Sequence, residues 1–238
     1  MKLSNRDLQT WLHALTSQPA KPDGLSQWLL GPLKDFFAFK RVILGHGEQV
    51  AGQIHLTHTL ALGHEPAYLK QLATTFDLKT RGTMLWWFTH RKPFNLDPDK
   101  PPPFATAFEI QEIRRFGLGR LAAHGILNAK TNAGTYFSFS GIEQELTGWH
   151  LDALTVIAPV LNDLYLALIA AEQTGAHAAL ANLTRRQNDI VRLIAIGLGD
   201  KSIANTLGIA EKTVRYQLSE VYAQVGVHRR GQLMAMLR

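Results

Sequence analysis

Residues 183–230 read LTRRQNDIVR LIAIGLGDKS IANTLGIAEK TVRYQLSEVY AQVGVHRR, and this stretch decides the fold of the last quarter of the chain. Thr184 is followed three residues later by Gln187, a pair that is typical of a capping box at the start of a helix. Apolar residues then recur at helical spacing until Gly197 and Gly199. The pattern therefore predicts a first short helix that ends at these glycines.

Two more helices are expected in this stretch, the first of them from about Lys201 to Leu207. Gly208 follows, and glycine can take the positive φ that a sharp turn needs. The next helix begins near Glu211. Its inward face is apolar, with Val214, Leu218, Val221 and Val225. Its outward face is polar and basic, with Lys212, Thr213, Arg215, Tyr216 and Ser219. A short helix, a glycine turn and a basic second helix predict a helix-turn-helix.

The pattern resembles the DNA-binding domain of the LuxR family of bacterial transcription regulators. The shared features are Leu183-Thr184, Arg186, Gly197, Lys201 to Ala204, Leu207 to Ile209, Thr213 to Arg215 and Val225 to Val227. The resemblance covers residues 183–238 and implies an all-α domain of four helices. It also implies that the helix around residues 211–225 enters the major groove of double-stranded DNA.

Three positions depart from the family pattern. Gln187 stands where the family has Glu, so the cap is kept and a charge is lost. Ala210 stands where the family has a capping Ser, which removes about 1 kcal/mol unless another group caps the helix. Gln217 stands where the family has His, at a position where the resemblance implies that a contact to DNA can change.

The distribution of charge favours the same interpretation over a helical bundle with ordinary solvated cations. Residues 183–238 hold nine Lys or Arg and four Asp or Glu, a net charge of +5, while the whole chain carries +6. The basic excess therefore lies where the motif lies, as phosphate binding requires.

The resemblance implies a homodimeric regulator that binds an inverted-repeat promoter site with half-sites about one helical turn apart. Arg215, Tyr216 and Ser219 are expected to face the bases. The expected contacts to the DNA backbone come from Lys201, Lys212, Thr213 and Arg230.

Composition limits what the rest of the chain can be. With 238 residues, of which 46% are hydrophobic, it can bury a substantial core. There is no cysteine, which excludes disulfides. The apolar run from Leu151 to Ala171 is interrupted by polar residues and a proline, so no membrane span is expected. No signal-peptide core follows the N-terminus. We expect a soluble, cytoplasmic protein.

Residues 1–173 are expected to form an α+β domain, an antiparallel sheet flanked by helices, followed by an Ala-rich linker at 174–182 and the DNA-binding domain at 183–238. The expected strands are 39–45, 53–60, 121–127 and 135–140, with turns at 45–47 and around 132–134. The expected helices are 4–16, 23–36, one after Pro66, one around 84–90, 104–116 and 145–172, with a loop at 93–103.

Two hairpins framed by helices resemble sensor domains of the GAF/PAS kind, and LuxR-type regulators commonly carry such a domain, including those that bind acyl-homoserine lactones. The lactone-binding pattern has an aromatic residue, a Tyr four residues later, and an Asp-Pro pair. Aligned from Tyr68, this chain has Leu72 and then Arg81-Gly82 at the last two sites. Because Arg has no acceptor for the ligand amide, a small-molecule effector other than such a lactone is expected.

An aromatic cluster supplies the candidate ligand-binding residues: Tyr68, Arg81, Trp86, Trp87, Phe94 and Tyr136. Neighbouring helical residues point about 100° apart, so the two tryptophans cannot share one face. Either one of them lines a pocket, or both belong to an aromatic core with one ring partly exposed. Arg81 is either a group that binds a carboxylate or phosphate, or an ordinary surface arginine.

Other chemistry finds little support. His46, His55, His58 and His64 lack acidic or thiol neighbours at ligand spacing, so no metal site and no cofactor is expected. The chain has no phosphate loop and no Gly-x-Ser-x-Gly elbow, so no enzyme is expected. The alternative for the N-terminal domain is a ligand-independent module for dimerisation or protein interaction.

Overall fold

The computed structural model describes residues 3–50, 53–74, 78–128 and 133–237. The chain forms two compact units, Met1–Leu168 and Ile169–Arg238. Each is considered by itself.

A five-stranded sheet is the centre of the first unit. Its strands are β1 (Arg41–Val50), β2 (Gln53–Leu62), β3 (Phe94–Leu96), β4 (Arg120–Asn128) and β5 (Ala133–Ile142). They lie in the order β2-β1-β5-β4-β3, and every neighbouring pair is antiparallel. The two hairpins predicted from the sequence are confirmed, and β1 and β5 join them into one sheet.

The prediction of a turn at Gly45 to Gly47 is wrong, because β1 continues through both glycines to Val50. Gly45 pairs with Thr59 and with Tyr136, and the register of β1 and β2 shifts between His46 and Gly47. Glycine inside a strand often marks such a bulge. The turn expected around Asn132 falls on a residue outside the described ranges.

The helices of this unit are α1 (Asn5–Thr16), α2 (Leu25–Leu30), α3 (Pro32–Phe36), α4 (Pro66–Thr74), α5 (Gly82–His90), α6 (Ala107–Arg115) and the part of α7 (Gly148–Ala181) that ends at Leu168, with short 3-10 turns at Pro22–Gly24 and Leu78–Thr80. The single helix predicted over 23–36 is broken, because Gly31 leaves the helical region and Pro32 starts a new helix. The loop predicted over 93–103 contains the short strand β3.

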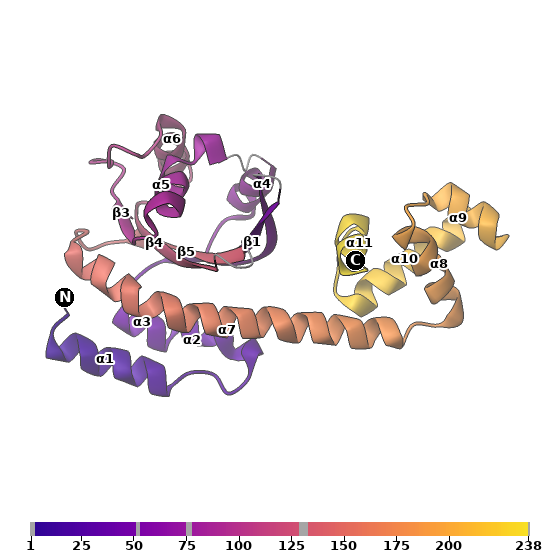
Figure 1. Cartoon of the computed structure of the whole chain (residues 1–238), viewed down its shortest axis with the longest axis horizontal. Coiled ribbons are helices and arrows are strands. Elements are labelled where there is room, and N and C mark those ends of the chain that lie inside the picture. Colours follow the sequence, from indigo (N-terminus) through magenta and orange to yellow (C-terminus); the bar gives the residue numbers. More distant parts are fainter. Residues whose placement is uncertain (1–2, 51–52, 75–77, 129–132, 238) are drawn as a thin grey trace. The chain divides into compact units, whose positions relative to one another are not determined.

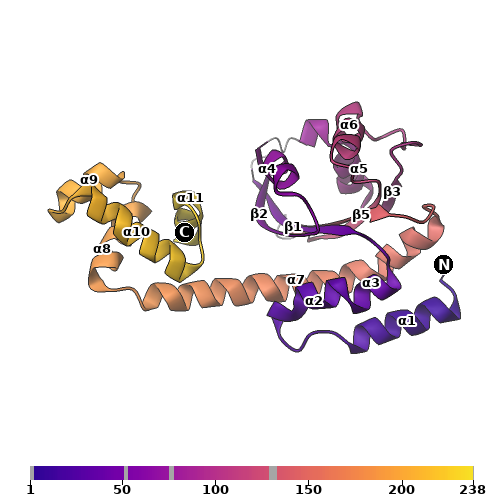
Figure 2. The same cartoon turned by 180° about the vertical axis from the view of Figure 1, so that it is seen from behind.

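Helices cover both faces of the sheet, with α4, α5 and α6 on one face and α1 to α3 and the first part of α7 on the other (Figures 1 and 2). On the α7 face the packing is dense: Phe37 and Phe139 pack edge to face at 5.2 Å. The hydroxyl of Tyr165 on α7 donates to the carbonyl oxygen of Leu44 at 3.1 Å. This α+β arrangement is the one that the sequence predicts.

The long helix α7 extends further than the predicted range of 145–172, and residues 174–181 of the predicted linker are helical. By length and composition it is apolar enough to cross a membrane, as is the core helix of many soluble proteins. One stripe of α7 is buried, and it includes Leu154, Ile157, Leu161 and Tyr165. The predicted domain limits at 173 and 183 stay a prediction.

The second unit contains α8 (Arg185–Ala195), α9 (Asp200–Leu207), α10 (Glu211–Val225) and α11 (Arg230–Met236). All four short helices lie in the predicted stretch. The capping box is present: the amide of Gln187 donates to the hydroxyl of Thr184, and the amide of Thr184 donates to the side chain of Gln187. Val214, Leu218, Val221 and Val225 are buried in one apolar core with residues of α8, α9 and α11.

Candidate functional site: a helix-turn-helix face and a buried cavity

The turn between α9 and α10 is made by Gly208, whose φ of 63° lies in the left-handed region. Glycine takes this conformation without the steric cost that a Cβ atom would add. The amide of Gly208 donates to the carbonyl of Asn205, and the amide of Ile209 donates to that of Ala204. The turn thereby closes α9 and directs the chain into α10.

The outward face of α10 carries the polar side chains that the sequence places there. Lys212, Thr213, Arg215, Tyr216 and Ser219 are all exposed, and so is Lys201 on α9. The aromatic ring of Tyr216 on this face is 62% exposed. The four apolar residues at the predicted spacing point the other way, so the division into an apolar and a polar face is confirmed.

Two of the residues that are expected to contact DNA form ion pairs with acidic side chains. Arg215 donates to Glu211 at 2.8 Å, one helical turn back, and lies 4.0 Å from Asp200. Arg230 is half-buried, donates to Asp200 at 2.9 Å and also donates to the carbonyl oxygen of Leu198. The first pair is exposed and so contributes little stability. The second ties α11 to the start of α9.

No side chain caps the start of α10. Ala210 occupies the N-cap position and makes no side-chain hydrogen bond there. Of the two possibilities that the sequence leaves open, the structure therefore has the uncapped helix start.

The second feature of interest is a cavity of about 120 Å³ on the face of the sheet that α4, α5 and α6 cover. Its lining is mainly apolar, with Ile43, Leu72, Leu96, Ile113, Leu118 and Leu121 among the contributors. A smaller cavity of about 40 Å³ lies next to it on the same face of the sheet. Both are lined by Gly45, Leu56, Met84 and Tyr136.

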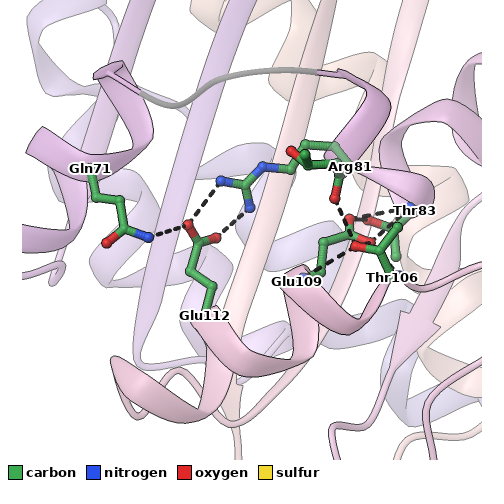
Figure 3. A network of polar contacts seen from close by, with 7 residues as sticks. Gln71, Arg81, Thr83, Thr106, Glu109 and Glu112 are labelled. Atoms are coloured by element: carbon green, nitrogen blue, oxygen red, sulfur yellow. Dashed lines mark hydrogen bonds and ion pairs between the residues drawn. The ribbon is translucent and has the colours of Figure 1, made fainter.

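A buried ion pair forms part of the cavity wall (Figure 3). Arg81 donates through both terminal nitrogens to Glu112, and Gln71 donates to the same carboxylate at 3.0 Å. Arg81 is 8% exposed and Glu112 4%. Burial alone would lower the pKa of Arg81, but the hydrogen bonds and charge of Glu112 outweigh it and raise that pKa. Removing one partner of such a pair costs about 3–5 kcal/mol.

The interpretation of Arg81 as a surface arginine is therefore wrong. The residue is instead buried against the cavity, with a carboxylate of this chain as its partner. The sequence could not show this, since Glu112 lies 31 positions further along the chain.

Glu109 is a second buried acid beside the cavity, and it lies at the start of two helices (Figure 3). It accepts from the amide of Thr83 at 3.2 Å, in the first turn of α5, and from the amide of Thr106 at 2.9 Å, the N-cap of α6. The partial positive charge of each helix N-terminus stabilises a carboxylate there. The sequence signal was available, because Thr106-x-x-Glu109 has the form of a capping box.

The predicted pocket residues take different positions. Tyr68 and Tyr136 line the larger cavity, Tyr136 and Trp87 the smaller one. Trp87 is buried and donates from Nε1 to Nδ1 of His124 at 3.2 Å. Trp86 stacks between His90 and Phe104 with centroid distances of 4.5 Å, outside both linings. Phe94 is buried in the adjacent core.

Tyr136 pairs with a glycine on each neighbouring strand, Gly45 on β1 and Gly125 on β4. A Cβ atom at Gly125 would lie 2.8 Å from Cζ2 of Trp87, so the bare backbone there admits the indole ring. Tyr136 and Trp87 then pack at 67° with centroids 5.2 Å apart.

The histidines are dispersed. His46 and His58 face each other across β1 and β2 with centroids 6.3 Å apart. Within the described ranges, no group of three or more His, Cys, Asp or Glu side chains is placed to hold a metal ion.

In the comparison with known proteins, the family match falls in the second unit. Residues 181–237 match the family described as "Bacterial regulatory proteins, luxR family". Two mycobacterial proteins whose names call them HTH-type transcriptional regulators, from Mycobacterium bovis and Mycobacterium tuberculosis, are 42% identical to this chain over 53 residues. That segment is 22% of this chain and 6% of each relative, so the chain spans only a small part of their length.

The similarity to solved structures covers a larger part of this chain than the sequence matches do. SdiA in complex with octanoyl-rac-glycerol has a TM-score of 0.53 at 15% identity, over 99% of this chain and 96% of that one. Escherichia coli SdiA alone gives 0.50 at 16%, over 97% and 94%. CepR2 from Burkholderia cenocepacia, named as an N-acylhomoserine lactone dependent LuxR family transcription factor, gives 0.50 at 12%, over 70% and 99%. At these identities the likeness shows the fold.

Proposed function

We propose that the chain is a transcription regulator that binds double-stranded promoter DNA, because residues 181–237 match the family of bacterial regulatory proteins named after LuxR. In this proposal it acts as a homodimer on an inverted repeat, with α10 of each subunit in the major groove. One observation carries the proposal: α10 buries four apolar residues and presents a basic, polar face to solvent beside the turn at Gly208.

The side chains on that face divide into two roles. Arg215, Tyr216 and Ser219 lie along the part of α10 that would face base edges. Lys201, Lys212 and Thr213 lie at the starts of α9 and α10, where they would contact phosphates and fix the register of the protein on DNA. The pair between Arg215 and Glu211 is exposed, so a guanine base or a phosphate can replace Glu211 at little cost.

Arg230 has a different part in this proposal from the other cations. Its guanidinium already donates to Asp200 and to the carbonyl of Leu198. It would contact the DNA backbone only through its remaining N–H groups, and its main role would be to position the start of α9.

The test is sequence-specific footprinting with Arg215→Ala. If Arg215 reads a base, the specific complex should weaken by about 1–3 kcal/mol, roughly 5- to 150-fold, while binding to random duplex changes less. Arg192→Ala is the matched control, since Arg192 is exposed on α8 and lies outside the proposed contacts. An unchanged footprint with Arg215→Ala would contradict this placement of α10.

We propose that the N-terminal unit controls this binding by responding to a small molecule. The cavity under α4, α5 and α6 supports this role, because a ligand that binds two arrangements of the protein unequally shifts their populations. The arginine at position 81, engaged by Glu112, argues against a classical acyl-homoserine lactone as that molecule.

The alternative is a ligand-independent regulator whose N-terminal unit dimerises or recruits a protein. Native mass spectrometry of the protein purified from its own host separates the two. A sensor should carry or take up a small compound in a stoichiometric amount, and a protein of unchanged mass under all growth conditions would favour the alternative.

A further inference from the structure

The larger cavity contains polar atoms that nothing in the described part of the chain satisfies. Four buried atoms without a hydrogen-bond partner belong to residues that line it: both ring nitrogens of His64, Nε of Arg81 and Oγ of Ser140. Arg81 and Ser140 are 8% and 2% exposed. Buried polar groups are nearly always paired in folded proteins, so each of these atoms requires an explanation.

Two of these residues lie at the same end of the sheet. Ser140 on β5 pairs with Arg41, the first residue of β1. The next residue of β1, Val42, pairs with Leu62, the last residue of β2. His64 follows two positions later, so the register places it near Ser140. We refer to this region, His64 and Ser140, as the polar end of the cavity.

The two side chains of the polar end, His64 and Ser140, are themselves uncharged, and the charge of Arg41 reaches His64. Burial, followed by the charge of Arg41, lowers the pKa of His64 to about 4, so its imidazole is neutral near pH 7. It then offers one N–H donor and one nitrogen acceptor, while Ser140 offers a hydroxyl that can donate or accept. Tyr68 stacks on His64 with centroids 5.1 Å apart and holds the ring against the cavity.

The charges elsewhere in the wall are matched within the protein. Glu112 accepts from Arg81, and Glu109 accepts from amides at the N-termini of α5 and α6. A ligand carboxylate would meet two carboxylates whose partners are already in place. A ligand ammonium would meet Arg81. Neither charged group would gain a free counter-ion from the described lining residues.

We propose that the cavity takes an uncharged molecule whose hydroxyl or carbonyl group hydrogen-bonds to His64 and Ser140 and whose apolar part lies along the sheet. This inference rests on the proposed sensor role and names the class of compound that the role requires. The polar end, rather than Arg81, is then the specificity-determining element.

The size of the cavity limits the class of ligand further. A cavity of about 120 Å³ is of the order of an engineered cavity that holds a single benzene ring. The smaller cavity shares Met84 and Tyr136 with it, and Met is a side chain that adapts its shape readily. A short apolar tail could therefore extend past Met84 toward Phe88 and Leu127, which line the smaller cavity.

The experiment uses the full chain and four probes that each contain one benzene ring: phenol, toluene, benzoate and benzylamine. Binding is measured by ligand-observed NMR and by the change in Tm at pH 7. Phenol should bind, toluene should bind more weakly, and benzoate and benzylamine should bind at least about tenfold more weakly than phenol.

Ser140→Ala should weaken phenol about three- to tenfold and leave toluene unchanged, because one hydrogen bond is lost. It should not lower the Tm of the free protein, since it removes an unpaired buried hydroxyl. Ser138→Ala is the matched control: Ser138 lines the same cavity two residues earlier on β5, and its hydroxyl is not among the enclosed, unpaired atoms. His64→Phe should weaken phenol in the same way as Ser140→Ala.

The inference is overturned if benzoate or toluene binds as tightly as phenol, if Ser138→Ala and Ser140→Ala have equal effects, or if none of the four probes binds. Footprinting of the same wild-type sample separates this failure from failure of the regulator proposal. An intact footprint without probe binding overturns the inference alone, whereas the absence of a footprint contradicts the proposed function.

Discussion

At the scale of single residues, the N-terminal unit buries several ionisable side chains. His124 is 8% exposed and accepts a hydrogen bond from Trp87 at Nδ1, so this nitrogen must be unprotonated. Burial lowers the pKa of His124 to about 4. In the unfolded chain the pKa returns to its usual range near 6.5.

This difference predicts a loss of stability in acid. Between pH 6.5 and about 4 the unfolded state binds a proton that the folded state does not, so the free energy of unfolding falls as the pH falls through this window. It changes little above pH 7. Urea denaturation at several pH values measures the slope of the free energy of unfolding against pH.

In His124→Gln the slope should be smaller, though not zero, because the pKa of His64 is also lowered to about 4. His13→Gln, at an exposed site on α1, should leave the slope as it is. Parallel pH curves for the wild type and His124→Gln would contradict a neutral, buried His124.

The same scale shows what a sequence cannot reveal about a site. Tyr68, Arg81 and Tyr136 were predicted as pocket residues, and all three line the larger cavity. Glu109 and Glu112 were not predicted, because a helix with alternating acids and apolar residues normally turns its acids outward. The capping box Thr106-x-x-Glu109 was a local signal for Glu109, but the partners Arg81 and Thr83, which meet these acids inside the fold, cannot be read from local spacing.

At the scale of elements, local signals identified the C-terminal helices well. Capping residues, glycine turns and apolar spacing all agree within residues 183–238, and such agreement makes a pattern decisive. The sheet was harder to delimit, since Gly45 and Gly47 are typical of a turn but lie in β1. The three-residue strand β3 lies among prolines and is formed through pairing with β4, a contact that is distant in sequence.

The uncapped start of α10 gives a prediction at this scale. Ala210→Ser should stabilise the protein by about 1 kcal/mol, because the serine hydroxyl can accept from an orphan amide in the first turn. Thermal or urea unfolding measures the change.

Ala223→Ser makes the same substitution at an exposed site within α10 and should destabilise it by roughly 0.5 kcal/mol through helix propensity. Equal effects of the two substitutions would indicate that α10 begins at another residue.

At the scale of the whole molecule, charge is distributed unequally along the chain. Residues 183–238 carry +5 of the total +6, so the larger part of the chain is close to neutral. An electrostatic contribution to DNA binding should therefore come from the last quarter alone, and it should depend on salt through the release of counterions.

Lys212→Ala tests this distribution. It should weaken binding to specific and random duplexes alike and should reduce the slope of log K against log salt by about 1. Lys34→Ala, at an exposed position on α3, should leave the slope unchanged. Fluorescence anisotropy titrations from 50 to about 200 mM salt provide the slopes. If Lys212→Ala weakened binding only to the specific site, Lys212 would contact a base and not a phosphate.

The glycine at position 125 has a consequence for the space beneath α5. It contributes no atoms to either cavity lining, yet the ring of Trp87 rests on its backbone, where a methyl group would not fit. A side chain at this position would meet the backbone of β5 as well as the indole ring, so Trp87 and the helix that carries it would have to move. Gly125 therefore affects the smaller cavity through Trp87, which lines it, without lining that cavity itself.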